Sequence, residues 1–128
     1  MNDFAKAWVT ALRSGEYPQA LGRLRSDDAY CCLGVACELF RQMYGEGEWE
    51  DDTDIGASHF SIGIAIEEGI LPDRVRDALG LADSEGGYYD NGDGISSLIK
   101  LNDDGTTFAE IAGIIESEPR WLFVEASE

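Results

Sequence analysis

The sequence predicts an α+β fold, a mostly helical single domain around a buried central helix at residues 28–44. Two observations favour this class. Residues 29–40 are almost all apolar or small, which is typical of a helix that is buried on most sides. Residues 60–66 alternate large and small side chains, and residues 120–124 have the composition of a strand. We expect these two segments to pair as a small antiparallel sheet.

Local signals set the ends of the expected helices. Residues 3–13 carry apolar side chains at helical spacing, and Asn2 or Asp3 can cap their start. Asp27 or Asp28 can cap the central helix, which Gly45 should end. Each of these helices therefore has both a start and a stop signal.

The second half of the chain offers shorter elements. A helix is expected after Pro72, with Gly80 as its stop, and residues 95–101 fit either a short helix or a strand. Thr107 and Glu110 have capping-box spacing, so another helix should start there and end before Pro119. The 128 residues suit one domain with two acidic loops, at 45–58 and 83–94.

Charge is the most informative property of the sequence. The net charge is −17, yet residues 1–45 hold as many basic as acidic residues, so the whole excess lies in residues 46–128. Such a surface repels nucleic acid and anionic lipid and attracts basic proteins or cations. The alternative is that the acids serve only solubility or a halophilic source.

No segment is apolar over the length that a membrane span requires, and the first residues lack the pattern of a signal peptide. Cys31, Cys32 and Cys37 are an odd set, too close together to cross-link distant elements, which favours reduced thiols. We therefore expect a cytoplasmic protein that does not associate with membranes.

The cysteines also support a catalytic hypothesis. A thiol near a helix N-terminus has a lowered pKa, and Cys31 or Cys32 occupies such a position in the expected central helix. His59 would be the base of this small hydrolase, and Asn102 or Asp103 would orient it. The simpler interpretation is that the thiols are small apolar fillers of a buried helix.

Metal and phosphate motifs are missing from the sequence. The stretch from residue 90 to 94 lacks the ligand spacing of an EF-hand, and adjacent cysteines in a helix point too far apart for a structural zinc site. No glycine-rich phosphate loop is present. We therefore expect no metal and no cofactor. A third hypothesis, a binder of a signalling nucleotide, rests on Arg13, Arg23 and Arg25 beside Tyr17 and requires a cavity lined by arginines.

Several segments resemble a family of small proteins found in phages and prophages. The similarity covers about half of the chain, within residues 8–39, 97–116 and, more weakly, 71–81. Its positions are Trp8, Leu12, Arg13, Gly15, Tyr17, Gln19, Tyr30, Cys31, Cys32, Leu33, Gly34, Val35, Leu101, Asn102, Asp103, Gly105, Phe108 and Ile111. The resemblance implies a gene of a mobile element and no particular activity. The acidic segments 46–66 and 83–94 lie outside it.

Together these observations predict a non-enzymatic interaction protein. Acidic proteins carried by phages resemble inhibitors of host defence, such as anti-CRISPR or anti-restriction proteins, which imitate nucleic acid. The expected partner is a basic, nucleic-acid-handling host protein, and direct binding to nucleic acid is not expected. An aromatic residue among the acids would anchor the contact. The candidate partner-binding residues are Glu46, Glu48, Trp49, Glu50, Asp51, Asp52, Asp54, Asp83, Glu85, Asp90 and Asp93.

Overall fold

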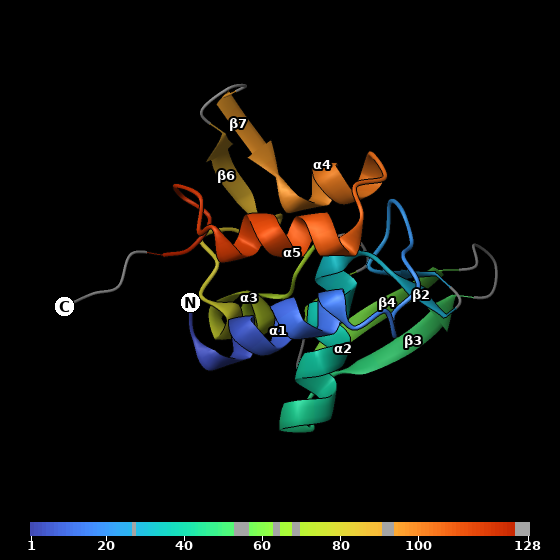
Figure 1. Cartoon of the computed structure of the whole chain (residues 1–128). Helices are drawn as coiled ribbons and strands as arrows, with labels where there is room; N and C mark the ends of the chain where they lie inside the picture. Colours follow the sequence, from blue (N-terminus) through green and yellow to red (C-terminus); the bar gives the residue numbers. More distant parts are fainter. Residues whose placement is uncertain (27, 53–56, 63–64, 68–69, 91–93, 125–128) are drawn as a thin grey trace.

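The computed structural model describes residues 1–26, 28–52, 57–62, 65–67, 70–90 and 94–124, and it confirms the α+β class. The helices are α1 (Asp3–Arg13), α2 (Cys32–Tyr44), α3 (Asp73–Leu79), α4 (Leu98–Asp103) and α5 (Phe108–Glu116). The strands are β1 (Arg25–Ser26), β2 (Ala29–Tyr30), β3 (Glu48–Asp52), β4 (Ala57–Ile62), β5 (Ala65–Glu67), β6 (Gly87–Asp90) and β7 (Gly94–Ser97). Figure 1 shows their arrangement. Within this described part, no helix combines the length and the apolar character needed to cross a membrane.

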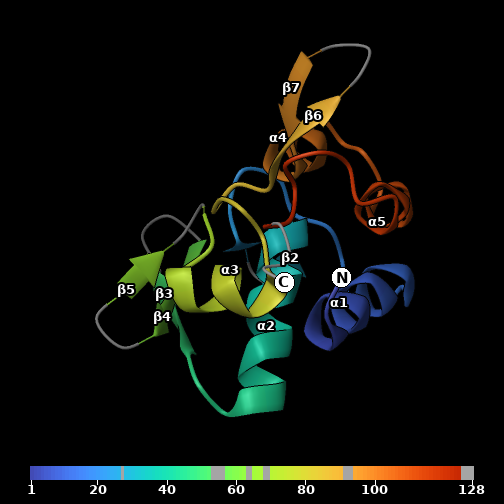
Figure 2. The same cartoon turned by 90° about the vertical axis from the view of Figure 1, so that its left-hand side faces the viewer.

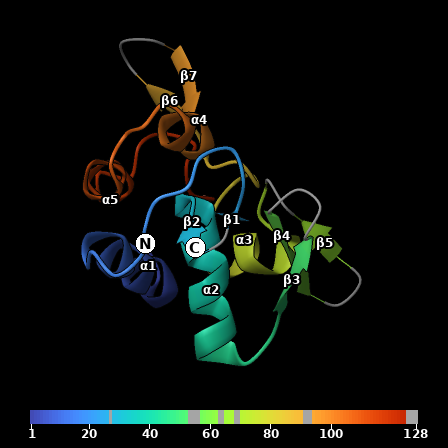
Figure 3. The same ribbon diagram turned by 90° about the vertical axis from the view of Figure 1, so that its right-hand side faces the viewer.

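Helix α2 is the centre of the fold, as predicted. It packs against α1, α3 and α4, and its residues from Cys32 to Val35 are fully buried or nearly so (Figure 3). Gly34 permits a close approach of the preceding loop, because a Cβ atom there would lie 1.7 Å from the carbonyl oxygen of Leu24. The core of the domain therefore forms around a helix whose small residues let neighbouring backbone come near.

The predicted start of this helix is wrong by four residues. Cys31, not an aspartate, is the N-cap, and its sulfur accepts a hydrogen bond from the backbone of Gly34. Residues Ala29 and Tyr30 form β2, and the backbone of Tyr30 bonds to Pro18 and Ala20. These strand and loop contacts use the backbone groups that a longer helix would need, so tertiary pairing overrides the local capping signal.

The other helices follow their local signals. Asn2 caps α1 with a 2.8 Å bond from Ala5, and Thr107 caps α5 through the backbone N–H of Glu110. Gly45 ends α2 in the left-handed conformation. Helices α1 and α5 lie side by side (Figures 1 and 3), and an ion pair joins Arg13 of α1 to Glu116 of α5.

The main sheet differs from the expected pairing. Its order is β2-β1-β4-β3, with β5 also paired to β4, and all of its pairs are antiparallel. The predicted strand at 60–66 divides between β4 and β5, which pair with each other. The expected partner at 120–124 makes only an isolated bridge, from Phe123 to Leu81. Strand β4 has closer partners along the chain, and Trp121 interrupts the extended backbone with φ of 75°.

The two segments expected to be acidic loops also contain strands. Residues 45–58 hold β3 and the start of β4, and residues 83–94 hold β6 and the start of β7, which form a separate two-stranded sheet. Strand β7 leads directly into α4, which resolves the ambiguity over residues 95–101. The β3–β4 pair and the β6–β7 pair lie in different parts of the molecule (Figures 1 and 2).

Candidate functional site

Strand β3 carries acids on one side and an aromatic anchor on the other. Successive side chains of a strand point to opposite faces, and here Glu48 and Glu50 are exposed whereas Trp49 is half-buried. The indole of Trp49 packs at 4.8 Å from the ring of Phe60 on β4 and at 5.8 Å from the ring of Tyr30, as measured between ring centroids. The alternation therefore fixes the carboxylates of Glu48 and Glu50 on the solvent face.

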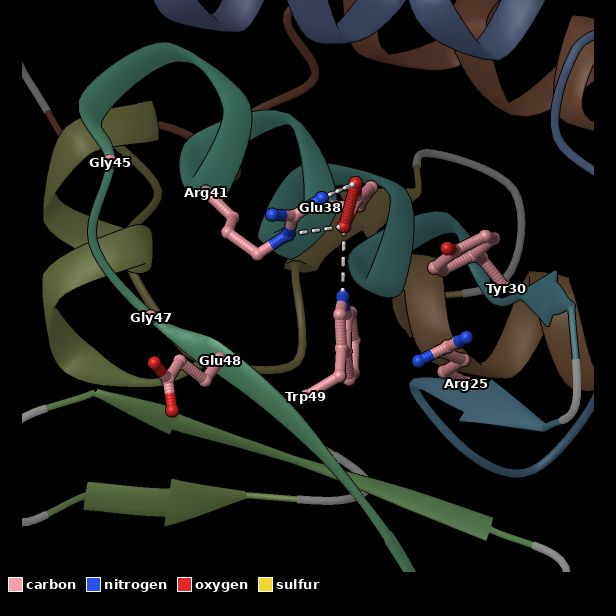
Figure 4. Close-up of a pocket in the computed structure, with 8 residues that line it drawn as sticks. All are labelled: Arg25, Tyr30, Glu38, Arg41, Gly45, Gly47, Glu48 and Trp49. Carbon is pink, nitrogen blue, oxygen red and sulfur yellow. Dashed lines mark hydrogen bonds and ion pairs between the residues drawn. The ribbon is translucent and has the colours of Figure 1, made fainter.

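A buried carboxylate connects this strand to the central helix. Glu38 of α2 is only 5% exposed. Its two oxygens accept hydrogen bonds from Arg41 at 2.8 and 2.7 Å, from Gln42 at 2.7 Å and from the indole N–H of Trp49 at 3.0 Å. Figure 4 shows the indole of Trp49 pointing at this carboxylate. Each oxygen has two donors, so the charge is fully satisfied within the protein.

The environment of Glu38 favours its charged form. Burial raises the pKa of this carboxyl group, whereas the hydrogen bonds from Arg41, Gln42 and Trp49 lower it, and the net pKa lies below the ordinary value of 4.5. The carboxylate is therefore ionised at neutral pH, and it holds β3 in place through Trp49.

A pocket of about 570 Å³ opens beside Trp49 (Figure 4). The guanidinium carbon of Arg25 lies 5.7 Å from the ring centroid of Tyr30 and 5.6 Å from that of Trp49, within the range of cation–π attraction. Arg41, Glu38 and Glu48 also line the pocket. The lining therefore contains two guanidinium groups and two carboxylates, so its formal charge is balanced.

The other candidate residues of the first acidic segment have different surroundings. Glu46 forms a 2.6 Å ion pair with Arg74 of the neighbouring helix α3. The backbone of Asp51 and Asp52 lies in β3, opposite Ser58 and Ala57. Asp54 lies outside the described residues. Glu48 and Glu50 are the exposed members of this segment for which the described structure shows no ion pair.

The second acidic segment belongs to a different surface. Asp83 accepts hydrogen bonds from the backbone of Glu85 and Gly87, both at 2.9 Å, so it shapes the turn before β6. Glu85 is exposed and Asp90 lies in β6, whereas Asp93 is outside the described residues. Because β6 is remote from β3 in all three views, the candidate partner-binding residues of the two acidic segments do not share one surface (Figures 1, 2 and 3).

The geometry of the cysteines argues against nucleophilic catalysis. All three are buried. Burial raises the pKa of the Cys31 thiol from its ordinary value of 9.0 to about 11, and burial also raises the pKa of Cys32 and of Cys37. These thiols are protonated at neutral pH and closed to substrate, as expected of small apolar fillers.

The proposed orienting residue, Asn102, is structural. Its side chain is fully buried, donates to the carbonyl of Ala20 at 2.7 Å and accepts from the backbone N–H of Cys32 at 3.1 Å and from Gln19 at 3.0 Å. Asp103 accepts from the backbone of Gly22 at 2.7 Å. The backbone of His59 pairs with Glu50 on β3. Gln19, Asn102 and Asp103 thus connect the loop before β1 to helices α2 and α4.

The described structure also contains an aromatic surface that the sequence did not predict. Trp121 is 53% exposed and Ile95 is 77% exposed. The ring of Tyr89 lies 5.2 Å from that of Trp121, as measured between centroids. Residues 120–124 have the composition of a strand, which hides the turn at Trp121. The proline at 119 and the run of polar residues before it are the local signals that would have favoured a turn.

No group of three or more His, Cys, Asp or Glu side chains in the described ranges is arranged to hold a metal ion. A family model described as a domain of unknown function (DUF8296) matches residues 1–119. Comparison with curated proteins gave no match, and neither did comparison with solved structures.

Proposed function

The chain belongs to the DUF8296 family, and we propose that it is a phage- or prophage-encoded interaction protein that binds a basic surface of a host protein. The partner handles nucleic acid in the cytoplasm of the host cell, and an anti-CRISPR or anti-restriction role by imitation of nucleic acid fits this chemistry. The chain itself performs no catalysis in this proposal.

The exposed carboxylates of β3 support the proposal best. Glu48 and Glu50 face solvent without an ion pair in the described structure, while Trp49 between them is hydrogen-bonded to Glu38 and packed on Phe60. Free carboxylates on a fixed strand keep their charge for a partner, and the backbone that carries them is already ordered before it binds. This combination is what a cationic groove would recognise.

Nucleic-acid-binding grooves supply the complementary chemistry. They are lined by Lys and Arg, and much of their affinity comes from neutralising phosphate charge. Carboxylates held on a strand compete for the same cations, and the net charge of −17 raises the rate of encounter with a basic protein. A merely protective role is the alternative, because charged residues on an edge strand also prevent edge-to-edge aggregation.

A second candidate function is favoured by the pocket beside Trp49. Two arginines, Arg25 and Arg41, line it, and the guanidinium of Arg25 lies next to the rings of Tyr30 and Trp49, a combination that suits a nucleotide. The carboxylates of Glu38 and Glu48 in the same pocket oppose the phosphate of such a ligand. Titration of tryptophan fluorescence with nucleotides, compared between wild type and Trp49→Phe, would reveal binding at this pocket.

Affinity capture from host lysate tests the leading proposal. One variant carries Glu48→Gln, Glu50→Gln, Asp51→Asn and Asp52→Asn. Its matched control carries Glu16→Gln, Asp77→Asn, Asp104→Asn and Glu110→Gln, which removes the same charge from exposed positions elsewhere. We expect wild type and control to retain a basic protein at low salt and release it at high salt, and the β3 variant to lose it. Equal capture by both variants would refute the role of β3.

A further inference from the structure

Tyr89, Ile95 and Trp121 form one exposed apolar surface, which we call the aromatic surface. Tyr89 of β6 lies directly opposite Ile95 of β7, so their side chains share a face of the two-stranded sheet. The backbone N–H of Tyr89 donates a 2.7 Å hydrogen bond to the carbonyl of Arg120, which brings Trp121 to the same place. The rings of Tyr89 and Trp121 meet edge to face at 5.2 Å.

The backbone at Trp121 has a strained conformation. Its φ of 75° lies in the left-handed region, which a bulky residue rarely adopts. The neighbouring Leu122 is fully buried and fills the core, whereas the ring of Trp121 is 53% exposed. The fold therefore holds a large aromatic residue in an unfavourable conformation and leaves much of its ring in water. An outlier of this kind marks a candidate functional position.

A concavity next to the ring offers room for a partner side chain. The pocket of about 320 Å³ is lined by Glu118, Pro119, Arg120, Trp121 and Phe123. The guanidinium carbon of Arg120 lies 5.4 Å from the ring centroid of Trp121. An apolar side chain that enters here would contact Trp121 and Phe123 and displace water from both.

Charge selects the occupant of the aromatic surface. Residues 83–93, which include β6, contain four acidic residues and no basic one. A second copy of the chain would bring the same acids and a further net charge of −17, so self-association is opposed by repulsion. The pocket beside Trp121 contains one basic residue, Arg120, and one acidic residue, Glu118, so the excess charge that a partner meets is that of the whole chain. A basic partner segment that exposes an apolar side chain complements both the rings and this net charge.

We propose that the aromatic surface docks an apolar side chain of a basic protein segment, separately from the carboxylates of β3. The basic character of the partner rests on the proposed function, while the docking position rests on the geometry of Tyr89, Ile95 and Trp121. Trp121 is the anchor of this contact, because large aromatic residues contribute most to binding at the centre of an interface.

Two peptides of equal length and charge test the proposal on the full chain. One alternates lysine and leucine to form an apolar face, and the other replaces each leucine with serine. We expect wild type to bind the leucine peptide about tenfold more tightly, since burying one leucine contributes about 1.5 kcal/mol or more. Calorimetry measures both affinities, and the indole N–H resonance of Trp121 should shift only with the leucine peptide.

Variants test which residues produce the tighter binding of the leucine peptide. Trp121→Gly suits the left-handed backbone and is expected to fold, and Ile95→Ser changes an exposed side chain. Each variant should bind the leucine peptide only as tightly as it binds the serine peptide. Leu21→Ser, at a position that is 56% exposed in the loop before β1, should keep the full gain.

The outcomes separate this proposal from the proposed function. Equal binding of both peptides to wild type would overturn the aromatic surface and leave the acidic contact standing. Failure of both peptides to bind would contradict the proposed function as well. Sedimentation of wild type as a dimer that Trp121→Gly dissociates would show that a second copy is the occupant, which also overturns the proposal.

Discussion

The indole N–H of Trp49 donates a 3.0 Å hydrogen bond to the buried carboxylate of Glu38, and this bond connects the acidic strand to the central helix. Trp49→Phe keeps a ring beside Phe60 and removes this donor, together with part of the indole packing against Tyr30. We expect the free energy of unfolding to fall by about 1.5–3 kcal/mol, because the acceptor is charged. Urea denaturation measures it. Trp121→Phe is the control and should change stability by less than about 0.5 kcal/mol, since its ring faces solvent.

The ionisation of Glu38 predicts a pH dependence. Its pKa is lower in the folded state than the ordinary 4.5, so the folded state binds this proton less tightly than the unfolded state does. The stabilisation is complete above pH 4.5 and disappears as the pH falls through the folded pKa. Glu38→Gln should lower the free energy of unfolding by about 3 kcal/mol at pH 7. The NH2 group of the glutamine would face hydrogen-bond donors, and it cannot accept hydrogen bonds from them.

Denaturation at several pH values checks this sign. The gap in unfolding free energy between wild type and Glu38→Gln should narrow as the pH drops below 4.5, because wild type then loses the charge that the variant lacks. The comparison of two chains removes the common effect of the other acids. A gap that stays constant down to acidic pH would show that Glu38 is not ionised in the folded protein.

The buried thiols predict slow chemical modification. Because the pKa of Cys31 is about 11 and all three thiols are buried, a thiol reagent at neutral pH should label the native protein only through unfolding. Labelling should accelerate steeply in urea, in parallel with the loss of structure followed by circular dichroism. Fast labelling of one cysteine in the native protein would revive the hydrolase hypothesis.

Two Gly→Ala substitutions, one in α2 and one in α5, form a matched pair that tests the close packing of α2. In Gly34→Ala the new methyl group would meet the carbonyl oxygen of Leu24 at 1.7 Å, so the loop before β1 must move. We expect a loss of about 3 kcal/mol or failure to fold. Gly113→Ala on the exposed face of α5 meets nothing within 4 Å and should stabilise the protein by about 0.5–1 kcal/mol. Thermal denaturation distinguishes the two, and equal effects would contradict this account of α2.

Local signals in the sequence were sufficient for much of the helical structure. Asn2, Gly45 and Thr107 act at the ends of helices as their residue types predict, because a cap depends on atoms a few residues away. The start of α2 was missed because Ala29 and Tyr30 are held by strand and loop partners. The pairing of 120–124 was missed for a similar reason, since long-range register is not encoded in one segment.

The candidate site was predictable only in part. Composition located the acids of β3, and alternation could have shown that Trp49 points away from Glu48 and Glu50. Glu38 was the overlooked signal, because a lone carboxylate on a helix buried on most sides requires hydrogen-bond donors. The exposure of Trp121 depends on a turn in which this residue has a φ of 75°. No residue type in this segment predicts that conformation.

The salt dependence of binding to an oligolysine peptide tests the central claim most directly. The slope of the logarithm of affinity against the logarithm of salt counts the charge contacts that form. We predict a shallower slope for the variant in which Glu48, Glu50, Asp51 and Asp52 are replaced by Gln or Asn. The slope should be unchanged in the control variant, which carries the same replacements at Glu16, Asp77, Asp104 and Glu110. Equal slopes for the two variants would contradict the claim that β3 is where a cationic partner docks.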